Sequence, residues 1–203
     1  MKNVIFDLGA VLVEWNPNAI ASQFTDDVDL QQRVVNEIYL HRVWADFDQG
    51  LADEAETLKN MSQVLAIDAA QAHRLLQLTK DSLNLIPRTV EVMQQCKKQQ
   101  LGVYCLSNIS PSFLSHLQGL HDFFDMFDGI VTSGAEHTAK PEAEIFEILL
   151  QRYELDPQHC LFIDDSSANT STARSFNINT VTFQGSSDCY ARISQWLDNV
   201  HPQ

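Results

Sequence analysis

Apolar and polar positions along this chain follow two patterns, one typical of buried strands and one typical of helices. Short apolar runs occur at residues 3–6, 101–106, 129–132, 160–163 and 179–183. Runs of this length, separated by stretches with helical spacing of apolar residues, predict parallel strands joined by helices. The chain should therefore have an α/β fold with a doubly wound, mainly parallel sheet of the Rossmann-like type.

The long segment between the first and second apolar runs contains no convincing strand. Leu30, Val34 and Ile38 recur at helical spacing, and Asp68 can cap a helix that runs on to Leu83. The pattern therefore predicts that this segment is helical throughout.

This helical segment predicts two domains. Residues 17–85 should form an all-helical cap domain, inserted into an α/β core domain of residues 1–16 and 86–203. The alternative is that the segment is simply part of one α/β core. A cap is favoured because a reactive group at the sheet edge needs a lid that excludes water.

Asp7 comes directly after the first apolar run and is followed by Leu8 and Gly9. It should lie at the carboxyl edge of a buried strand, which is where open α/β sheets bind ligands. A carboxylate placed there can hold a metal ion or attack an electrophile. The alternative for Asp7 alone is an ordinary turn.

Polar groups also occur at the ends of other predicted elements. Ser107 and Asn108 follow the second apolar run, Lys140 precedes a helix expected to open at a proline, and Asp164 and Asp165 follow a later run. With Asp7 they supply a nucleophile, polar anchors, a cation and an acidic pair. Phosphoryl transfer requires these components for positioning and charge neutralisation.

This ordered set of residues resembles the haloacid dehalogenase superfamily, most of whose members are magnesium-dependent phosphatases. The motifs that resemble it are Phe6-Asp7-Leu8-Gly9-Ala10-Val11-Leu12, Leu106-Ser107-Asn108, Lys140-Pro141-Glu142 and Ile163-Asp164-Asp165-Ser166-Ser167-Ala168-Asn169. They stand in the family's order. The first is most similar to the branch that holds the α-D-glucose-1-phosphate phosphatases and the phosphatase domain of soluble epoxide hydrolases.

The resemblance implies a role for each motif. Asp7 would be the nucleophile that forms an aspartyl phosphate, and Ser107 and Asn108 would anchor the phosphate. Lys140 would neutralise both the phosphate and Asp7. The implied enzyme is a hydrolase of small phosphate monoesters, such as sugar phosphates and in particular aldose 1-phosphates.

The resemblance also implies a magnesium site. The ion would be held by Asp7, the carbonyl of Gly9 and the Asp164–Asp165 pair, with Asp165 favoured as the direct ligand. Oxygen-only ligands suit magnesium, which keeps several waters for a substrate phosphate to displace.

One position departs from the family pattern. Most phosphatases of the superfamily have a second aspartate, a general acid and base, two residues after the nucleophile, where this chain has Gly9. General acid–base help contributes about 10²–10⁴-fold. An anomeric oxygen leaves more easily than a primary hydroxyl, so aldose 1-phosphates should suffer least from the missing acid. The branch that the chain resembles also has this glycine.

Three other functions share part of the pattern. A 2-haloacid dehalogenase needs no metal and has small hydroxyl residues where this chain has Asp164 and Asp165. A phosphomutase relies on the acid–base aspartate that Gly9 replaces. A non-catalytic receiver-like module has its acidic pair early in the chain and does not need a helical insertion. These differences favour a metal-dependent phosphatase.

Residues of the predicted cap and its approach are candidates for substrate specificity. They are Trp15, Arg42, Trp44 and Phe47. The alternative for Trp44 and Phe47 is a place in the apolar core of the cap.

Composition limits the partners and the compartment. The net charge of −14, from 13 Lys and Arg against 27 Asp and Glu, repels nucleic acid and anionic membranes. The 4 cysteines form no C-x-x-C pair and are expected to be core thiols in a reducing compartment. No apolar stretch approaches the ~20 residues of a membrane span. We expect a cytoplasmic protein whose partner is a small phosphate ester.

Overall fold

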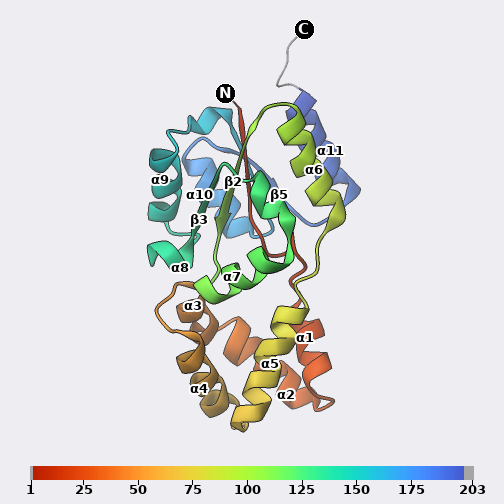
Figure 1. The fold of residues 1–203 in the computed structure, drawn as a ribbon, viewed down its shortest axis with the longest axis vertical. Helices are drawn as coiled ribbons and strands as arrows, with labels where there is room; N and C mark the ends of the chain where they lie inside the picture. Colours follow the sequence, from red (N-terminus) through yellow and green to blue (C-terminus); the bar gives the residue numbers. More distant parts are fainter. Residues whose placement is uncertain (1, 199–203) are drawn as a thin grey trace.

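A five-stranded parallel sheet lies at the centre of the computed structural model, which describes residues 2–198 (Figure 1). The strands are β1 (Asn3–Phe6), β2 (Gly102–Ser107), β3 (Gly129–Thr132), β4 (Cys160–Asp164) and β5 (Asn179–Thr182). Their order is β3-β2-β1-β4-β5, and every neighbouring pair is parallel. The predicted α/β class and the five predicted strands are confirmed.

The strand order reverses at β1. The chain passes from β1 to β2 and β3 on one side, then crosses to β4 and β5 on the other. Phe6 pairs with Cys105 of β2 and with Ile163 of β4. The residue after Phe6 therefore lies between the carboxyl ends of two neighbouring strands, where doubly wound sheets form their ligand crevice.

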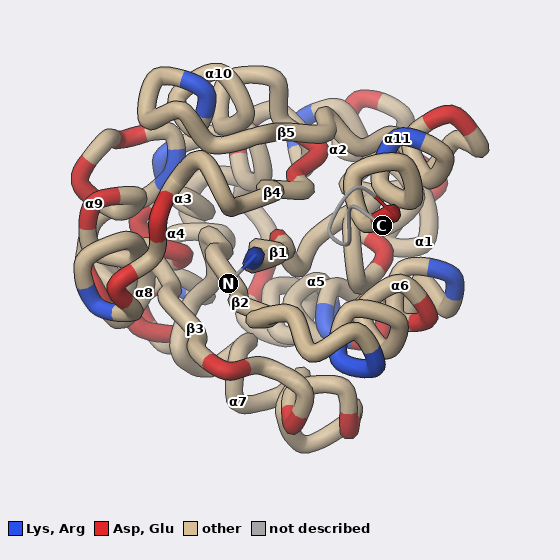
Figure 2. The backbone as a smooth tube through the Cα atoms, turned by 90° about the horizontal axis from the view of Figure 1, so that it is seen from above, with Lys and Arg blue, Asp and Glu red and all other residues tan. Residues whose placement is uncertain are grey.

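Helices cover both faces of the sheet (Figure 2). On one face are α6 (Pro87–Lys98) and α11 (Ser187–Asp198), and on the other are α9 (Ala143–Arg152) and α10 (Ser167–Ser175). Side chains of a strand alternate between the two faces, so Phe6 packs in the core below α6 and α11 while Ile5 packs against α9. The remaining helices of this part are α7 (Pro111–Leu120), η2 (Asp122–Met126), α8 (Ser133–Glu136) and η3 (Pro157–His159).

Residues 17–85, here called the helical insertion, lie beyond the carboxyl ends of the strands (Figure 1). Its helices are α1 (Pro17–Phe24), α2 (Val28–Arg33), η1 (Val34–Tyr39), α3 (Arg42–Asp48), α4 (Glu54–Leu65) and α5 (Ala69–Asp81). Asp68 caps α5 through a capping box with Gln71, as its position in the sequence predicts.

Two predicted helix boundaries are wrong. The helix capped by Asp68 was expected to reach Leu83, but it ends at Asp81 because the Ser82 hydroxyl and carbonyl form a turn with Thr79 and Asn84. The helix expected to open at the proline before Glu142 begins at Ala143 instead, since Glu142 has extended backbone angles.

The chain enters and leaves the helical insertion through two adjacent segments. The Glu14 N–H donates to the Asn84 carbonyl at 2.7 Å, and the Ile86 N–H donates to the Leu12 carbonyl at 2.9 Å. Val13 and Leu85 form an antiparallel bridge between these bonds. The insertion is thus joined to the sheet by one short antiparallel pair of segments.

Acidic residues are spread over many elements of the chain (Figure 2). The four cysteines are buried and free, as expected of core thiols. Among residues 2–198, no helix combines the length and the hydropathy that a membrane crossing requires.

Candidate active site

A cavity of about 240 Å³ lies where the carboxyl ends of β1 and β2 meet the helical insertion. Polar residues from the sheet side line its floor: Asp7, Ser107, Asn108, Lys140 and Asp165. The structure therefore brings together residues that are up to 162 positions apart in the sequence (Asp7 to Asn169). Gly9 lines the same cavity.

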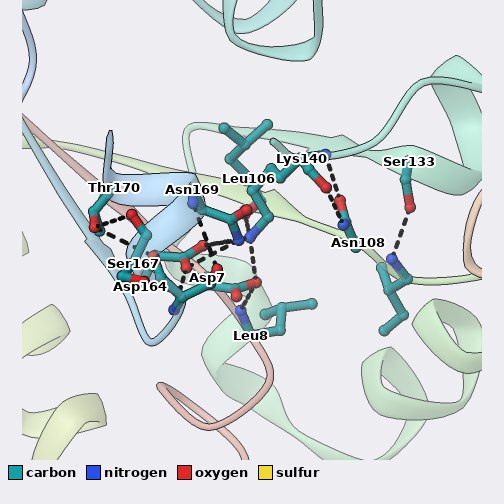
Figure 3. A network of polar contacts seen from close by, with 12 residues as sticks. Asp7, Leu8, Leu106, Asn108, Ser133, Lys140, Asp164, Ser167, Asn169 and Thr170 are labelled. Carbon is teal, nitrogen blue, oxygen red and sulfur yellow. Dashed lines mark hydrogen bonds and ion pairs between the residues drawn. The ribbon is translucent and has the colours of Figure 1, made fainter. Parts of the chain in front are cut away.

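Lys140 is the buried cation of this floor (Figure 3). Its ammonium group lies 2.9 Å from Asp7 Oδ1 and 2.7 Å from Asp164 Oδ2, and it donates to the Leu106 carbonyl at 2.8 Å. Burial acts to lower the pKa of Lys140, but the charges of Asp7 and Asp164 outweigh it and raise the pKa above its usual range. Lys140 is therefore charged at every physiological pH.

Asp7 is 7% exposed and shares this cation. The Leu8 N–H donates to its Oδ1 at 2.8 Å. Burial raises the pKa of Asp7 to about 7; Lys140 opposes this shift, and the nearby charge of Asp164 adds to it. The charged ammonium of Lys140 thus favours the ionised, nucleophilic form of Asp7.

Asp164 is held on both of its oxygens. Oδ2 accepts from Lys140 at 2.7 Å and from the Asn169 amide at 3.1 Å, and Oδ1 accepts from Asn169 at 3.0 Å and from the Ser166 N–H at 2.8 Å. The next residue, Asp165, is exposed. Neighbouring protein atoms partly desolvate the Asp165 carboxyl group. This desolvation and the charge of Asp164 raise the pKa of Asp165.

The three carboxylates form a group that fits a divalent cation. One oxygen from each of Asp7, Asp164 and Asp165 lies within 4.8 Å of the others. Three carboxylates against the one ammonium of Lys140 leave an excess of two negative charges, which a divalent ion would balance. Carboxylate and carbonyl oxygens are the ligands that magnesium prefers.

Asn108 is engaged with the segment that presents Lys140. Its amide donates to the Lys140 carbonyl at 2.8 Å, and its Oδ1 accepts from the Lys140 N–H at 2.8 Å. This reciprocal pair fixes the backbone of Lys140 (Figure 3). The contacts of Asn108 thus show it holding the cation in place, a task that its sequence position alone did not indicate.

The upper walls of the cavity are apolar and aromatic. Trp15 stacks on Trp44 with ring centroids 5.6 Å apart, and Trp44 meets Phe113 edge to face at 5.5 Å. The other apolar lining residues include Tyr39, Leu83, Ile109 and Leu117.

Two of the four specificity candidates lie in this wall, and two do not. Trp15 and Trp44 line the cavity. Phe47 is 1% exposed and lies behind Trp44, within the apolar core. The Arg42 side chain is 80% exposed and pairs with Asp46 on its own helix. Phe47 is therefore absent from the cavity lining, whereas Arg42 lines an adjoining cavity together with Trp44 and Lys140.

Asp48, the last residue of α3, also lines the cavity. Burial raises the pKa of Asp48 well above its ordinary value, as does the charge of Asp7, while donors from the Ser110 N–H and the Trp44 side chain oppose the shift. Sequence reasoning missed this residue, because an acid in an amphipathic helix normally indicates a solvated face.

A family model of haloacid dehalogenase-like hydrolases matches residues 1–177. The sesquiterpene phosphatase astK of Aspergillus oryzae is 25% identical over 173 residues, which are 85% of this chain and 85% of that protein. The drimenol cyclase drtB of Aspergillus calidoustus is also 25% identical, over 90% of this chain, but the match spans only 34% of that longer protein.

A solved structure has the same fold. The haloacid dehalogenase family enzyme bt-2542 of Bacteroides thetaiotaomicron, determined in complex with magnesium and inorganic phosphate, matches with a TM-score of 0.76 and 22% identity, covering 92% of this chain and 96% of that one. The family match agrees with the arrangement of Asp7, Lys140 and Asp164 at the carboxyl edge of the sheet. The chain belongs to the haloacid dehalogenase-like hydrolases.

Proposed function

We propose that this hydrolase is a magnesium-dependent phosphatase of small phosphate monoesters, with Asp7 as its nucleophile. The observation that carries the proposal is the Asp7 carboxylate at the floor of a cavity, paired with the buried Lys140 and adjacent to a carboxylate group fit for a divalent ion. The similarity to a sesquiterpene phosphatase supports it. So does the fold shared with an enzyme crystallised with magnesium and phosphate.

The residues on the floor have complementary tasks in this proposal. The Asp7 carboxylate attacks phosphorus, and Lys140 holds both that carboxylate and a phosphate oxygen. Ser107, which hydrogen-bonds Asp7, lies beside the same position and anchors another phosphate oxygen. Such prearranged charges stabilise the transition state more than the ground state.

The magnesium ligands would be Asp7, Asp165 and the Gly9 carbonyl. Asp164 accepts four hydrogen bonds from protein groups, so it orients the site while Asp165 supplies the direct ligand. Bound magnesium would neutralise phosphate charge and align the ester with Asp7.

Magnesium should stabilise the folded protein, because the ion binds the native carboxylate group and not the unfolded chain. At a concentration 100 times Kd, the gain is about 2.7 kcal/mol. For a chain of this size that raises Tm by roughly 5–10 °C. Thermal unfolding with and without magnesium measures this shift, which Asp165→Asn should remove.

The matched control for that experiment is Asp26→Asn, which removes the same charge from an exposed loop between α1 and α2. It should keep the full magnesium shift. An unchanged shift in Asp165→Asn would place the ion elsewhere.

The cavity walls favour an apolar leaving group. Above the floor, the lining consists of aromatic and aliphatic side chains such as Trp15, Phe113 and Leu117. The Tyr39 hydroxyl is already bonded to Thr79 at 2.6 Å. A sugar placed there would lose water without gaining partners for most of its hydroxyls, which is costly. We propose that residues 17–85 act as a cap domain, which supplies Tyr39, Trp44 and Leu83 to this wall.

A pair of matched esters tests this specificity. Cyclohexylmethyl phosphate and glucose 6-phosphate both release a primary alcohol from a six-membered ring. Burying roughly 80 Å² of apolar ring yields about 2 kcal/mol, so kcat/KM should favour the cyclohexyl ester about 30-fold. Trp15→Gln should shrink this preference, whereas Arg74→Ala, a control on the exposed face of α5, should not.

Glucose 1-phosphate belongs in the same assay, because the family resemblance points to aldose 1-phosphates. A wild-type preference for either glucose phosphate over the cyclohexyl ester would contradict the apolar assignment. The phosphatase activity itself would still stand.

A further inference from the structure

We propose that Asp48 is the general acid that protonates the leaving group, and the general base for the water that follows. Asp48 would take over, from the helical insertion, the task of the second aspartate that this chain replaces with Gly9. The inference rests on the proposed phosphatase function. Two observations carry it: Asp48 lines the same cavity as Asp7, and its carbonyl and carboxyl groups both accept hydrogen bonds from the sheet-bearing part of the protein.

The position of Asp48 is fixed by the sheet-bearing part of the protein. The Ser133 hydroxyl donates to the Asp48 carbonyl, and the Ser110 N–H donates to its carboxyl group. The next carbonyl along, that of Gln49, lies 3.1 Å from His137 Nδ1. Figure 1 shows α3 beside α8 at the junction of the two parts. These contacts hold Asp48 at a position where it lines the same cavity as Asp7.

A close approach of backbones reinforces this junction. Gly50 has a φ of +67°, and a Cβ on it would lie 2.6 Å from the Gly134 carbonyl oxygen. Only glycine permits both the left-handed conformation and the contact. The end of α3, and Asp48 with it, is thus docked tightly against α8.

Asp48 differs from Asp7 and Asp164 in its partners. Lys140 forms ion pairs with Asp7 and Asp164, whereas Asp48 forms none with any cation in residues 2–198. Its carboxyl group accepts a hydrogen bond from the Trp44 side chain, which is part of the aromatic wall. A carboxyl group without a counter-ion in such surroundings favours its neutral form. The raised pKa of Asp48 agrees with this state, with Asp7 and Lys140 as the charged groups that face it.

No other residue of the described cavity lining is as well suited to deliver a proton. Asp7 and Asp165 are committed to the nucleophile and the metal group in the proposed function. The Tyr39 hydroxyl is bonded to Thr79, and burial raises the pKa of Tyr39 above its ordinary range. Gly9 has no side chain that could carry a proton. A Cβ at this position would lie 3.7 Å from Trp15 Cβ.

The reaction then balances in two steps. An Asp7 oxygen forms a bond to phosphorus as the bond from phosphorus to the ester oxygen breaks, and the Asp48 proton moves to that oxygen to release the alcohol. Asp48 is now a carboxylate. It accepts a proton from the water that attacks phosphorus, the bond to Asp7 breaks, and inorganic phosphate leaves with both aspartates restored.

Leaving-group dependence distinguishes this role from a structural one. p-Nitrophenolate leaves without protonation, whereas a primary alkoxide requires a proton. Asp48→Asn should therefore lower kcat/KM for cyclohexylmethyl phosphate by about 10²–10⁴-fold, and that for p-nitrophenyl phosphate less than tenfold. Asp48→Glu, which keeps the acid, should retain a larger share of the alkyl ester activity.

Asp46→Asn is the matched control, because Asp46 lies on the same helix and pairs with Arg42 outside the cavity. It should leave both esters unaffected. Equal losses for the two esters in Asp48→Asn, or no loss for either, would overturn the assignment. Failure of the wild-type enzyme to hydrolyse p-nitrophenyl phosphate would instead overturn the phosphatase function.

The wild-type enzyme provides a test that needs no stable variant. With the leaving oxygen protonated in the transition state, kcat/KM should vary only weakly with the pKa of the leaving phenol across a series of substituted phenyl phosphates. A steep decrease as the phenol becomes less acidic would show that no acid assists departure, and would overturn the role of Asp48.

Discussion

Asp7→Asn is expected to lower kcat by about 10⁴-fold or more, since an amide oxygen is a far weaker nucleophile than a carboxylate. The fold should survive the change. An Asn Oδ1 can still accept the Leu8 N–H, and Lys140 keeps its pair with Asp164 at 2.7 Å. Steady-state kinetics with p-nitrophenyl phosphate, together with Tm, measure both parts of this expectation.

Asp46→Asn serves again as the control, with activity close to wild type. A folded Asp7→Asn protein with activity within about tenfold of wild type would remove Asp7 from the role of nucleophile. The cavity floor would then need another attacking group, or water acting directly.

Lys140→Met should be the most damaging single change for stability as well as a severe one for activity. It removes the buried ammonium that lies 2.9 Å from Asp7 and 2.7 Å from Asp164. Breaking a buried ion pair costs about 3–5 kcal/mol, because the remaining carboxylates stay buried without compensation. Loss of a preorganised charge in the site should also lower kcat by about 10²–10³-fold.

Lys97→Met is the matched comparison. Lys97 pairs with Asp128 at 2.7 Å, but both side chains are more than a third exposed. Surface pairs of this kind contribute about 0–1 kcal/mol. Denaturant unfolding of the two variants compares them directly. If Lys140→Met cost no more stability than Lys97→Met, the buried ion pairs of Lys140 with Asp7 and Asp164 would not stabilise the fold as proposed.

The sheet and its carboxyl edge were predictable because both depend on local pattern. An apolar run such as Asn3–Phe6 specifies a buried strand, and parallel strands bring their carboxyl ends to one edge. Asp7, Ser107 and Asp164 therefore converge once the strand order is known. The distances from Lys140 to both carboxylates depend on the segment after α8, whose conformation no short pattern specifies.

The helical insertion was harder to interpret at the level of single side chains. Trp44 and Phe47 are three residues apart on one helix, yet Trp44 lines the cavity and Phe47 lies behind it. Asp46 and Asp48 are both acids near the end of α3, but only Asp48 lines the cavity. Helical periodicity tells which face is apolar, and tertiary docking decides which part of that face meets the active site.

Trapping of the phosphorylated enzyme tests the central claim most directly. The wild-type protein is mixed with phosphate-labelled substrate and magnesium, quenched in acid within the first turnover, digested, and analysed by mass spectrometry. The account predicts a phosphoryl group on the peptide that contains Asp7, absent from Asp7→Asn and released as inorganic phosphate at later quench times. Turnover with the phosphoryl group on a different residue, or with Asp7 unmodified at every quench time, would contradict it.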